Sequence, residues 1–317
     1  MLLKELAYYK TGGKADHIKT PSSTAEVALI LKKLHQEGGR YFFLGSGSNS
    51  LVMDEAYGGS VISFHKLNHL QVEGDKILVG AGCLNTDLAK AAYDHGLAGL
   101  SWLYRLPGQL GATTRMNARC YGGEISEVVV SVEVVTREGE VVVYKNEGIF
   151  KGYKDTSFMT SGEAITQVTF QAHKGDPKEI WQKMQACEKD RLSKNQFDYP
   201  SCGCVFKNHH EIGVPSGMLL QAAGAKKMST KTLLVNPHHA NFVFNKGATS
   251  REILELTLKM RDAVYEEFGV FMAYEMEMLG DVPQDLKDQL AAQKPHKLKR
   301  DKLAPLIEAF ASRKASK

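Results

Sequence analysis

Two glycine-containing loops carry the residues best suited to bind a ligand. The first loop, residues 45–50, reads GSGSNS and follows the short apolar run Tyr41–Leu44. Backbone amides and hydroxyls in such a loop can hold a phosphate group. The loop is not the dinucleotide fingerprint, because the third glycine is missing and no helix is predicted after it. Taken alone, the pattern is more typical of a turn than of a phosphate site.

The second loop, residues 105–124, reads RLPGQLGATTRMNARCYGGE. Its glycines allow the backbone to approach a ligand closely and to take angles that other residues avoid. Thr113, Thr114, Asn117 and Tyr121 place short polar groups among the glycines. No helical or strand period runs through the stretch, and a long loop inside a domain is more often functional than idle. A tight turn beside a sheet is an equally good interpretation of this stretch alone.

Thiols and imidazoles occur in pairs, but their spacing does not predict a metal site. Cys202 and Cys204 form a Cys-x-Cys pair with no second pair at ligand spacing, so we expect two small buried residues. The histidine pairs at 209–210 and 238–239 are adjacent, and on a strand adjacent side chains point to opposite faces. We expect polar residues at the surface or near a substrate there, and no metal.

The elements that must position these loops alternate between helices and strands. Residues 23–26, STAE, read as a capping box that begins a helix, and Gly38-Gly39 ends it. Further helices are predicted at 85–95, 177–192, 218–223 and 251–268, and strands at 41–44, 60–64, 70–72, 77–79, 128–135, 140–144, 241–245 and 271–279. The order predicts a mixed α+β architecture in two lobes, with no internal repeat.

The composition is that of an ordinary globular protein, with 317 residues, 43% hydrophobic and 24% charged. There is no apolar run long enough for a transmembrane helix, and the first residues do not resemble a secretory signal. The five cysteines are an odd and scattered set, which suits a reducing compartment. We therefore expect a cytoplasmic protein.

The net charge of +4 is concentrated in residues 281–317, which hold nine Lys/Arg and five Asp/Glu. The rest of the chain is neutral and does not resemble a nucleic-acid-binding domain. The basic tail could contact nucleic acid or a membrane, but a solvated helix or a loose end is the commoner outcome. We expect no nucleic-acid partner and no membrane insertion.

Four stretches taken together are more specific than any one of them: GSGSNSLV at 45–52, LPGQLGATTRMNARCYGGE at 106–124, YPSCGCVFKN at 199–208 and YEMEMLG at 274–280. In this order and spacing they resemble the UDP-N-acetylenolpyruvoylglucosamine reductase family. The resemblance covers residues 5–280 and leaves out the basic tail. The stretch QFDYPS at 196–201 is similar to the shorter subtype of the family.

The resemblance implies an FAD-binding fold of the PCMH/vanillyl-alcohol-oxidase type, with two subdomains and a C-terminal α+β substrate-binding domain. The implied boundaries are 1–66 and 67–194 for the FAD-binding subdomains, 195–280 for the substrate-binding domain and 281–317 for the basic C-terminal tail. The implied activity is that of a UDP-N-acetylmuramate dehydrogenase. NADPH reduces FAD, and the hydride then passes to UDP-N-acetylglucosamine enolpyruvate. This places the chain in peptidoglycan synthesis, and hence in cell wall biogenesis, cell shape and cell division. We expect a monomer.

Residue by residue, the resemblance implies three catalytic groups. Cys204 stands in place of the usual serine proton donor, and a thiol, with a pKa of about 8.5, is a stronger acid than a hydroxyl. Glu275 matches the glutamate that polarises the substrate carboxylate. Lys154 replaces the usual arginine, which keeps the charge but loses the bidentate fork. An enol ether accepts a hydride poorly unless its carboxylate is polarised, and a proton donor must lie within reach of C2.

The resemblance also implies a cofactor-binding and a substrate-binding set. The cofactor set is Gly45, Ser46, Gly47, Ser48, Asn49, Ser50, Leu51, Pro107, Gly108, Gly111, Ala112, Thr113, Asn117, Tyr121 and Gly122. The substrate set is Tyr153, Lys207 and Asn208.

Four further positions depart from the family pattern. Arg105 and Arg119 stand where the family prefers glycine, Ala112 replaces one glycine of a pair, and Tyr8 replaces a usual threonine. Bulky residues at glycine positions could clash with a flavin, or could be accommodated where the loop faces outward. Two other functions stay open: a flavin oxidoreductase of the same superfamily on another substrate, and a non-catalytic relative that binds a UDP-sugar.

Overall fold

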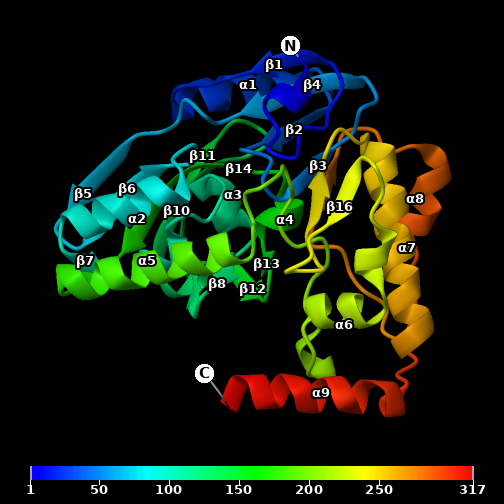
Figure 1. Cartoon of the computed structure of the whole chain (residues 1–317). Helices are drawn as coiled ribbons and strands as arrows, with labels where there is room; N and C mark the ends of the chain where they lie inside the picture. The colour runs from blue at the N-terminus through cyan, green and yellow to red at the C-terminus, as the bar shows by residue number, and fades with distance from the viewer. Residues whose placement is uncertain (1, 316–317) are drawn as a thin grey trace. The chain divides into compact units, whose positions relative to one another are not determined.

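The computed structural model describes residues 2–315 (Figure 1). The chain forms two compact units. The sheet unit comprises residues 15–46 and 58–192, and the C-terminal unit comprises residues 1–14, 47–57 and 193–317. The predicted subdomain boundaries at 66/67 and 194/195 belong to a finer division and stay predictions. Within residues 2–315 no helix is long and apolar enough to cross a membrane.

A five-stranded antiparallel sheet, in the order β11-β10-β14-β6-β5, forms the centre of the sheet unit. Its central strand β10 is rich in valine, and Val132 faces Tyr144 of β11 and Val168 of β14. β-branched residues suit such a pleated, buried surface. The strands of this sheet are β5 (Leu70–Glu73), β6 (Lys76–Gly80), β10 (Val129–Val135), β11 (Val141–Lys145) and β14 (Ala164–Gln171).

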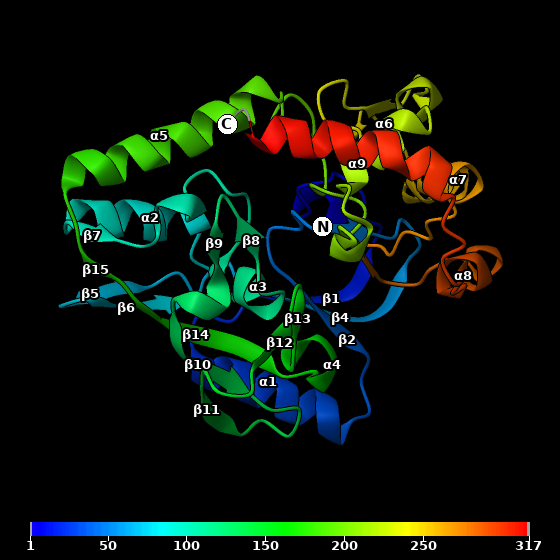
Figure 2. The same ribbon diagram turned by 90° about the horizontal axis from the view of Figure 1, so that it is seen from below.

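Helices cover this sheet on both faces. Helix α1 (Thr24–Gln36) and helix α3 (Leu110–Arg115) lie on opposite sides of β10 and β14 (Figure 2). Thr24 donates to Glu133 Oε1 over 2.8 Å, which ties the start of α1 to β10. Helices α2 (Asn85–Asp94) and α5 (Pro177–Ser193) lie side by side, with the rings of Tyr93 and Trp181 5.3 Å apart.

Shorter elements complete the sheet unit. A three-stranded sheet has the order β1-β4-β2, and three two-stranded pairs are β12-β13, β15-β7 and β8-β9. The bounds are β1 (Ala15–Lys19), β2 (Tyr41–Leu44), β4 (Tyr57–Ser63), β7 (Leu97–Ala98), β8 (Arg119–Cys120), β9 (Gly123–Glu124), β12 (Phe150–Gly152), β13 (Asp155–Thr156), α4 (Phe158–Ser161) and β15 (His173–Lys174).

The C-terminal unit is built around the long helix α7 (Ser250–Phe268), whose buried residues recur at helical spacing. A capping box of Thr249 and Glu252 begins this helix, and Gly269, at a φ of 69°, ends it. The other elements are β3 (Ser50–Val52), α6 (Ser216–Ala222), β16 (Leu233–Val235), β17 (Val243–Asn245), β18 (Glu277–Leu279), α8 (Gln284–Ala291) and α9 (Arg300–Ala315).

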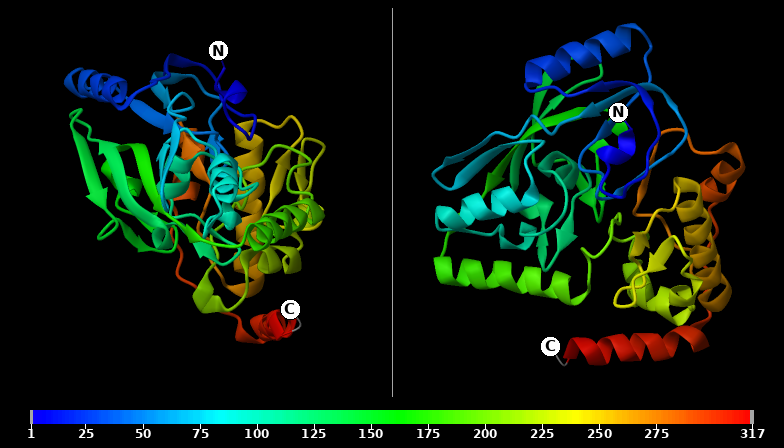
Figure 3. Two further views of the ribbon diagram at one scale, coloured as in Figure 1. Left: turned by 90° about the vertical axis from the view of Figure 1, so that its left-hand side faces the viewer. Right: turned by 45° about the horizontal axis from the view of Figure 1, so that its top comes forward.

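The segment that follows Gly280 is mostly exposed helix, as its composition predicts, but it is not a loose end. Helices α8 and α9 lie at opposite ends of α7 (Figure 3), and Leu286 and Leu303 are buried in the core of the C-terminal unit. Burial of a leucine side chain stabilises a fold by about 1.5–3 kcal/mol. We call residues 281–315 the C-terminal extension.

Most elements lie where the sequence predicts them, and two do not. Ser23 caps α1 by accepting from the Glu26 N–H, as predicted. The central loop is not wholly irregular, because α3 forms within it; a six-residue helix is too short to show a period. The predicted strand 271–279 is reduced to β18, because the N–H groups of Glu275 and Met276 both bond to the Val205 carbonyl and so interrupt the ladder.

Candidate active site

Glu275 lies in the C-terminal unit, on the extended segment that leads into β18. Its N–H donates to the Val205 carbonyl over 2.8 Å, and its own carbonyl accepts from Asn49 Nδ2 over 3.0 Å. The backbone is therefore held on both sides of the Glu275 Cα atom, while the side chain is half-buried. A carboxyl group on a fixed backbone can act on a ligand from a defined direction.

Cys204 directly precedes Val205 and pairs with Phe242 in an isolated antiparallel bridge. The next two residues are anchored to Asn241: its carbonyl accepts from the Val205 N–H over 2.9 Å, and its side chain bonds to both backbone groups of Phe206. Val205 thus joins Cys204 to Glu275, so the structure brings together two motifs that are about 70 residues apart in the chain.

Cys202 is fully buried, as predicted, whereas Cys204 is half-buried. Burial raises the pKa of the Cys202 thiol well above its ordinary value, and the nearby Cys204 and Glu275 raise it further. Cys202 therefore stays protonated at neutral pH, and a protonated thiol is a poor metal ligand. This supports a packing role for Cys202 and leaves Cys204 as the thiol that can reach a ligand.

Lys207 and Asn208 are fixed at the start of α6. The Ser216 N–H donates to Asn208 Oδ1 over 2.9 Å, and the Ser216 hydroxyl donates to the Lys207 carbonyl over 2.6 Å. The Lys207 N–H in turn donates to the Ala273 carbonyl over 2.9 Å. Both residues therefore lie next to the segment that carries Glu275.

The GSGSNS loop is divided between the two units after Ser46. In the C-terminal unit, a Cβ atom on Gly47 would lie 2.9 Å from the Ala7 Cα atom, so the loop packs closely on the residue before Tyr8. The Leu51 side chain is buried in the core, and the Asn49 amide is bonded to Glu275. The Asn49 carbonyl also accepts from the Glu277 N–H over 3.0 Å, so Asn49 has a second role that the motif alone does not reveal.

Lys154 lies in the sheet unit, in the turn between β12 and β13, and it has a φ of 55°. A left-handed conformation costs a residue with a Cβ atom about 1–2 kcal/mol. The turn, which includes Tyr153, is tied to the central loop on both sides. Asn117 Nδ2 donates to the Gly152 carbonyl over 3.1 Å, and the Thr156 hydroxyl donates to the Arg115 carbonyl.

Asn117 is itself buried, and its side chain also donates to Glu124 Oε1 over 2.6 Å and accepts from the Ser126 N–H over 3.0 Å. These bonds give Asn117 a structural role in addition to the cofactor role that the motif implies.

Tyr121 is exposed, and its hydroxyl donates to Asp190 over 2.8 Å. Neighbouring Gly122 is exposed as well, with open space around it.

The central loop contains buried polar side-chain atoms. Gln109 Oε1 and Thr114 Oγ1 are buried and have no hydrogen-bond partner among residues 2–315. A Cβ atom on Gly45 would lie 3.1 Å from Gln109 Oε1, and one on Gly111 would lie 2.7 Å from the Ala81 Cβ atom. Sequence reasoning noted Thr114 as a polar residue of this loop without placing it in the cofactor set, and it did not select Gln109; their one signal is that both are polar residues inside a glycine-rich loop.

The other predicted cofactor residues of this loop differ in exposure. Thr113 is buried, Pro107 and Gly108 are half-buried, and Ala112 is exposed. In the other glycine loop, Ser46, Ser48 and Ser50 are half-buried.

The two arginines at glycine positions are accommodated by pointing outward. Arg105 has a φ of 59°, which explains a preference for glycine there, and its side chain is 44% exposed and lies 3.1 Å from Glu188. The Arg119 side chain is 53% exposed and lies 3.7 Å from Glu124. Within the sheet unit both guanidinium groups therefore meet a carboxylate.

This chain resembles known proteins over most of its length. Residues 15–145 match the family model described as FAD binding domain. Residues 195–279 match the model described as UDP-N-acetylenolpyruvoylglucosamine reductase, C-terminal domain. The UDP-N-acetylenolpyruvoylglucosamine reductase of Clostridium kluyveri is 32% identical over 280 residues, which cover 88% of this chain and 91% of the relative. The chain belongs to the UDP-N-acetylenolpyruvoylglucosamine reductase family.

Two further members of the family give the same result. The reductase of Exiguobacterium sibiricum is 33% identical over 280 residues, which cover 88% of this chain and 91% of the relative. The crystal structure of the reductase from Thermus caldophilus superposes with a TM-score of 0.75 at 30% identity, and covers 88% of this chain and 97% of that one. The predicted fold class is confirmed, with an FAD-binding region and a C-terminal α+β substrate-binding domain.

The residues of the sheet unit fit the FAD that this family uses. Buried oxygens without partners, such as Gln109 Oε1 and Thr114 Oγ1, indicate a polar group that is completed by a ligand. Gly111 is needed for the close packing of α3 on Ala81, and Gly108, at a φ of 125°, allows the turn that precedes α3. Pro107, Gly108, Gly111 and Thr113 of the predicted cofactor set lie in the same loop as these two oxygens.

Proposed function

We propose that the chain reduces UDP-N-acetylglucosamine enolpyruvate to UDP-N-acetylmuramate, with FAD as cofactor and NADPH as hydride donor, in peptidoglycan precursor synthesis. Membership of the reductase family supports this reaction. One observation supports particular residues as the catalytic groups. The backbone of Glu275 is fixed by a bond to Val205, the residue that directly follows Cys204. When bound, FAD would carry the hydride from NADPH to the UDP-sugar.

Lys154 has the task of binding the substrate carboxylate, and Glu275 has the task of donating a hydrogen bond to it, which a carboxyl group does in its acid form. Negative charge develops on the substrate carboxylate when hydride reaches the enolpyruvyl C3 atom, and groups fixed before the reaction stabilise such charge most effectively. The fixed Glu275 backbone meets that requirement. Lys154 supplies a positive charge without the two-pronged geometry of arginine.

Cys204 has the task of delivering a proton to C2. A thiol holds its proton at neutral pH and releases it more readily than a serine hydroxyl does. We assign binding of the UDP-sugar to Tyr153, Lys207 and Asn208, and binding of FAD to the cofactor set given above together with Gln109 and Thr114. The bonds of Lys207 and Asn208 to Ser216 would hold the substrate-binding residues close to Cys204.

The test is an anaerobic half-reaction. The purified protein is photoreduced, UDP-N-acetylglucosamine enolpyruvate is added, and the visible flavin spectrum is followed. Reoxidation of the flavin with formation of UDP-N-acetylmuramate is expected. A flavin that stays reduced would point to another substrate of the same superfamily, and a colourless protein would point to a relative that only binds a UDP-sugar.

We further propose that the protein is a cytoplasmic monomer. The cysteines are free thiols, which suits a reducing compartment. Light scattering after gel filtration would give a mass near 35.0 kDa for a monomer. Cell fractionation would test the location.

A further inference from the structure

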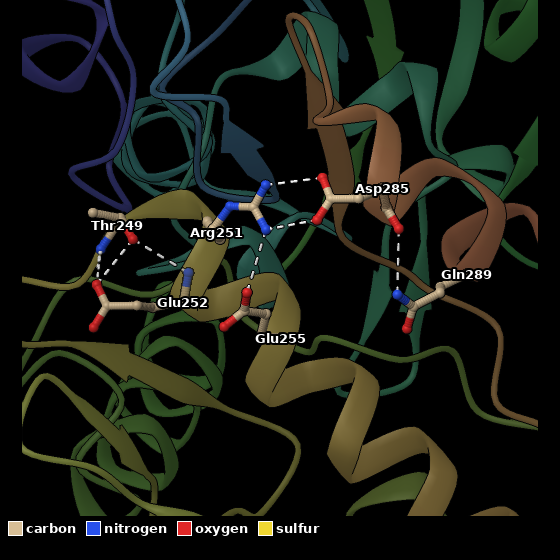
Figure 4. Close-up of polar contacts among 6 residues, drawn as sticks. All are labelled: Thr249, Arg251, Glu252, Glu255, Asp285 and Gln289. Carbon is tan, nitrogen blue, oxygen red and sulfur yellow. Dashed lines mark hydrogen bonds and ion pairs between the residues drawn. The ribbon is translucent and has the colours of Figure 1, made fainter.

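The C-terminal extension lies outside the family match, which ends at residue 279, yet it is attached along the whole of α7. At the start of α7, Arg251 binds Asp285 of α8 through two hydrogen bonds of 2.8 and 2.9 Å (Figure 4). Arg251 also reaches Glu255, and the Gln289 side chain bonds back to the Asp285 carbonyl within α8. A planar guanidinium that binds a carboxylate twice is a geometrically specific pair.

In the middle of α7, the extension completes the surroundings of a buried cation. Arg261 is 3% exposed and donates to the Gln289 carbonyl over 2.7 Å. Its guanidinium lies 4.7 Å from the centre of the Phe271 ring and 5.6 Å from that of Tyr274. A buried charge requires such partners, because an unpaired one is strongly destabilising. The extension therefore stabilises the side of Phe271 and Tyr274 that faces α7.

At the end of α7, the extension pairs with the chain that leads to Glu275. The Lys297 N–H donates to the Gly269 carbonyl over 2.7 Å, and the Lys299 N–H donates to the Phe268 carbonyl over 3.0 Å. His296 then accepts the Phe271 N–H at Nδ1 over 3.1 Å. Two residues further on, His209 accepts the Ala273 N–H at Nε2 over 3.3 Å.

Alternate N–H groups of the segment before β18 therefore find three successive acceptors. Phe271 donates to His296, Ala273 donates to His209, and Glu275 donates to the Val205 carbonyl. The first two acceptors are imidazole nitrogens and the third is a backbone carbonyl. The two histidines thus extend the ladder of hydrogen bonds beyond the point where the backbone pairing of residues 205–207 ends.

Glu211 joins the two imidazoles. Its Oε1 atom lies 3.1 Å from His209 Nδ1 and 3.9 Å from His296 Nε2, and the rings meet edge to face at 5.1 Å. The pKa of Glu211 lies below its ordinary value, first because of its own backbone N–H and then because of the two histidines.

These three side chains also have potential metal-ligand atoms within 4.8 Å of one another. However, the nitrogens that face Glu211 carry the hydrogens in the neutral tautomers that accept from Phe271 and Ala273. A metal would require lone pairs at those nitrogens. The arrangement therefore favours a hydrogen-bonded bridge over a metal site.

We propose that His296 of the C-terminal extension and His209 are positioning residues for Glu275. They hold the segment 271–273 in line with residues 205–207, so that Glu275 keeps its direction during hydride transfer. This inference rests on the proposed function. It predicts that the extension acts on the half-reaction with the UDP-sugar and not on the reduction of the flavin by NADPH.

The decisive pair of variants is His296→Ala and His296→Asn. Alanine removes the acceptor for the Phe271 N–H, whereas the asparagine side-chain oxygen can take the place of Nδ1. The side chain is 31% exposed, so both variants should fold. One hydrogen bond contributes about 0.5–1.5 kcal/mol, so H296A should slow flavin reoxidation by the UDP-sugar about threefold to tenfold. H296N should recover to within about twofold, since the acceptor is restored.

Asp285→Asn is the matched control. It weakens the Arg251 pair at the far end of α7 and leaves the histidines in place. Both half-reactions of D285N should run at wild-type rates. Flavin reduction by NADPH should be unchanged in H296A and H296N as well.

Unchanged reoxidation in H296A would overturn the proposal, and so would a defect that asparagine does not rescue or one that slows both half-reactions equally. Treatment of wild-type protein with EDTA should have no effect; a loss that matches H296A would show a metal site instead. If the wild-type flavin is not reoxidised by the UDP-sugar at all, the proposed function fails, which is a separate outcome from a failure of the positioning role.

Discussion

Glu275 and Lys154 are assigned to the same substrate carboxylate, but the fold supports them in different ways. Glu275 is held by backbone bonds to Val205 and by the Asn49 amide, none of which depends on its own side chain. Lys154 is held in a left-handed turn that is unfavourable for any residue with a Cβ atom, and the turn depends on Asn117 and Thr156. A substitution at Glu275 should therefore change chemistry alone, whereas a substitution at Lys154 should change both chemistry and stability.

A large effect is expected for Glu275→Ala, which removes the carboxyl group, whereas a glutamine amide could still donate to the substrate. Removal of one group that stabilises developing charge typically costs about 10²–10³-fold in rate. Flavin reoxidation by the UDP-sugar should fall by this factor, and the thermal midpoint should stay within error of wild type, because the bonds that fix residue 275 are backbone bonds. Stopped-flow and calorimetry on the same preparation test both parts. A clear loss of stability would contradict the proposed difference between the two residues.

Substitutions at Cys204, which lies in the same unit as Glu275, test whether its thiol is the proton donor. Loss of a general acid costs about 10²–10⁴-fold in rate. Cys204→Ala should accept hydride from NADPH normally but fail to pass it productively to the UDP-sugar. Cys204→Ser should retain substantial activity, since a hydroxyl can occupy the same position. Normal product formation by the alanine variant would remove Cys204 from the mechanism.

Lys154→Gly should separate the two effects that the turn combines. Glycine takes a positive φ without strain, so the variant should unfold with a free energy about 1 kcal/mol higher than wild type. Its reoxidation rate should fall because the cation is lost. Lys154→Arg is the control: it keeps the strain and the charge and restores the bidentate fork, so its rate should equal or exceed that of wild type. If the glycine variant is less stable, the turn is not strained.

The smallest effect is expected at the start of α7, which lies in the unit of Glu275 but holds no site residue. Thr249→Ala removes an N-cap and should cost about 1 kcal/mol of unfolding free energy without changing either half-reaction. Denaturant unfolding checks the first part. A fall in turnover would mean that a general loss of stability lowers activity. The rate changes of the Glu275 and His296 variants would then have to be corrected for their loss of stability.

The pH dependence of the same cap gives a further check. Bonds from the Thr249 N–H, the Thr249 hydroxyl and Thr232 hold the pKa of Glu252 below its ordinary value of 4.5. Its contribution to stability is therefore complete above pH 4.5 and is lost as the pH falls through the lower folded-state value. Wild type should exceed Glu252→Gln in stability at pH 7, and the difference should shrink below pH 4.5. A constant difference would show that the charge plays no part in the cap.

The sequence predicted the elements that carry their own signals. The capping residues of α1, the valine pattern of β10 and the apolar spacing of α7 each identify an element without knowledge of its neighbours. The motifs identified Cys204 and Glu275 as candidates. They did not show that Asn49 holds the Glu275 carbonyl, because that bond joins residues more than 200 positions apart.

Other features depend on contacts that no local pattern contains. The six residues of α3 are too few to show a period. The C-terminal extension is attached by two buried leucines, ion pairs such as Arg251–Asp285 and Glu267–Lys302, and several hydrogen bonds, and none of these stands out in a basic, polar stretch. The bridge of His209, Glu211 and His296 was missed for the same reason, since His296 comes more than 80 residues after the other two.

Gly269 serves two purposes that favour the same residue. Its backbone angle ends α7, which asparagine could also do, but a Cβ atom here would overlap the Lys297 carbonyl oxygen. The Lys297 N–H donates to the Gly269 carbonyl, so a side chain at residue 269 would displace the C-terminal extension at this point. The residue that stops the helix therefore also decides whether the C-terminal extension can pack on the end of α7.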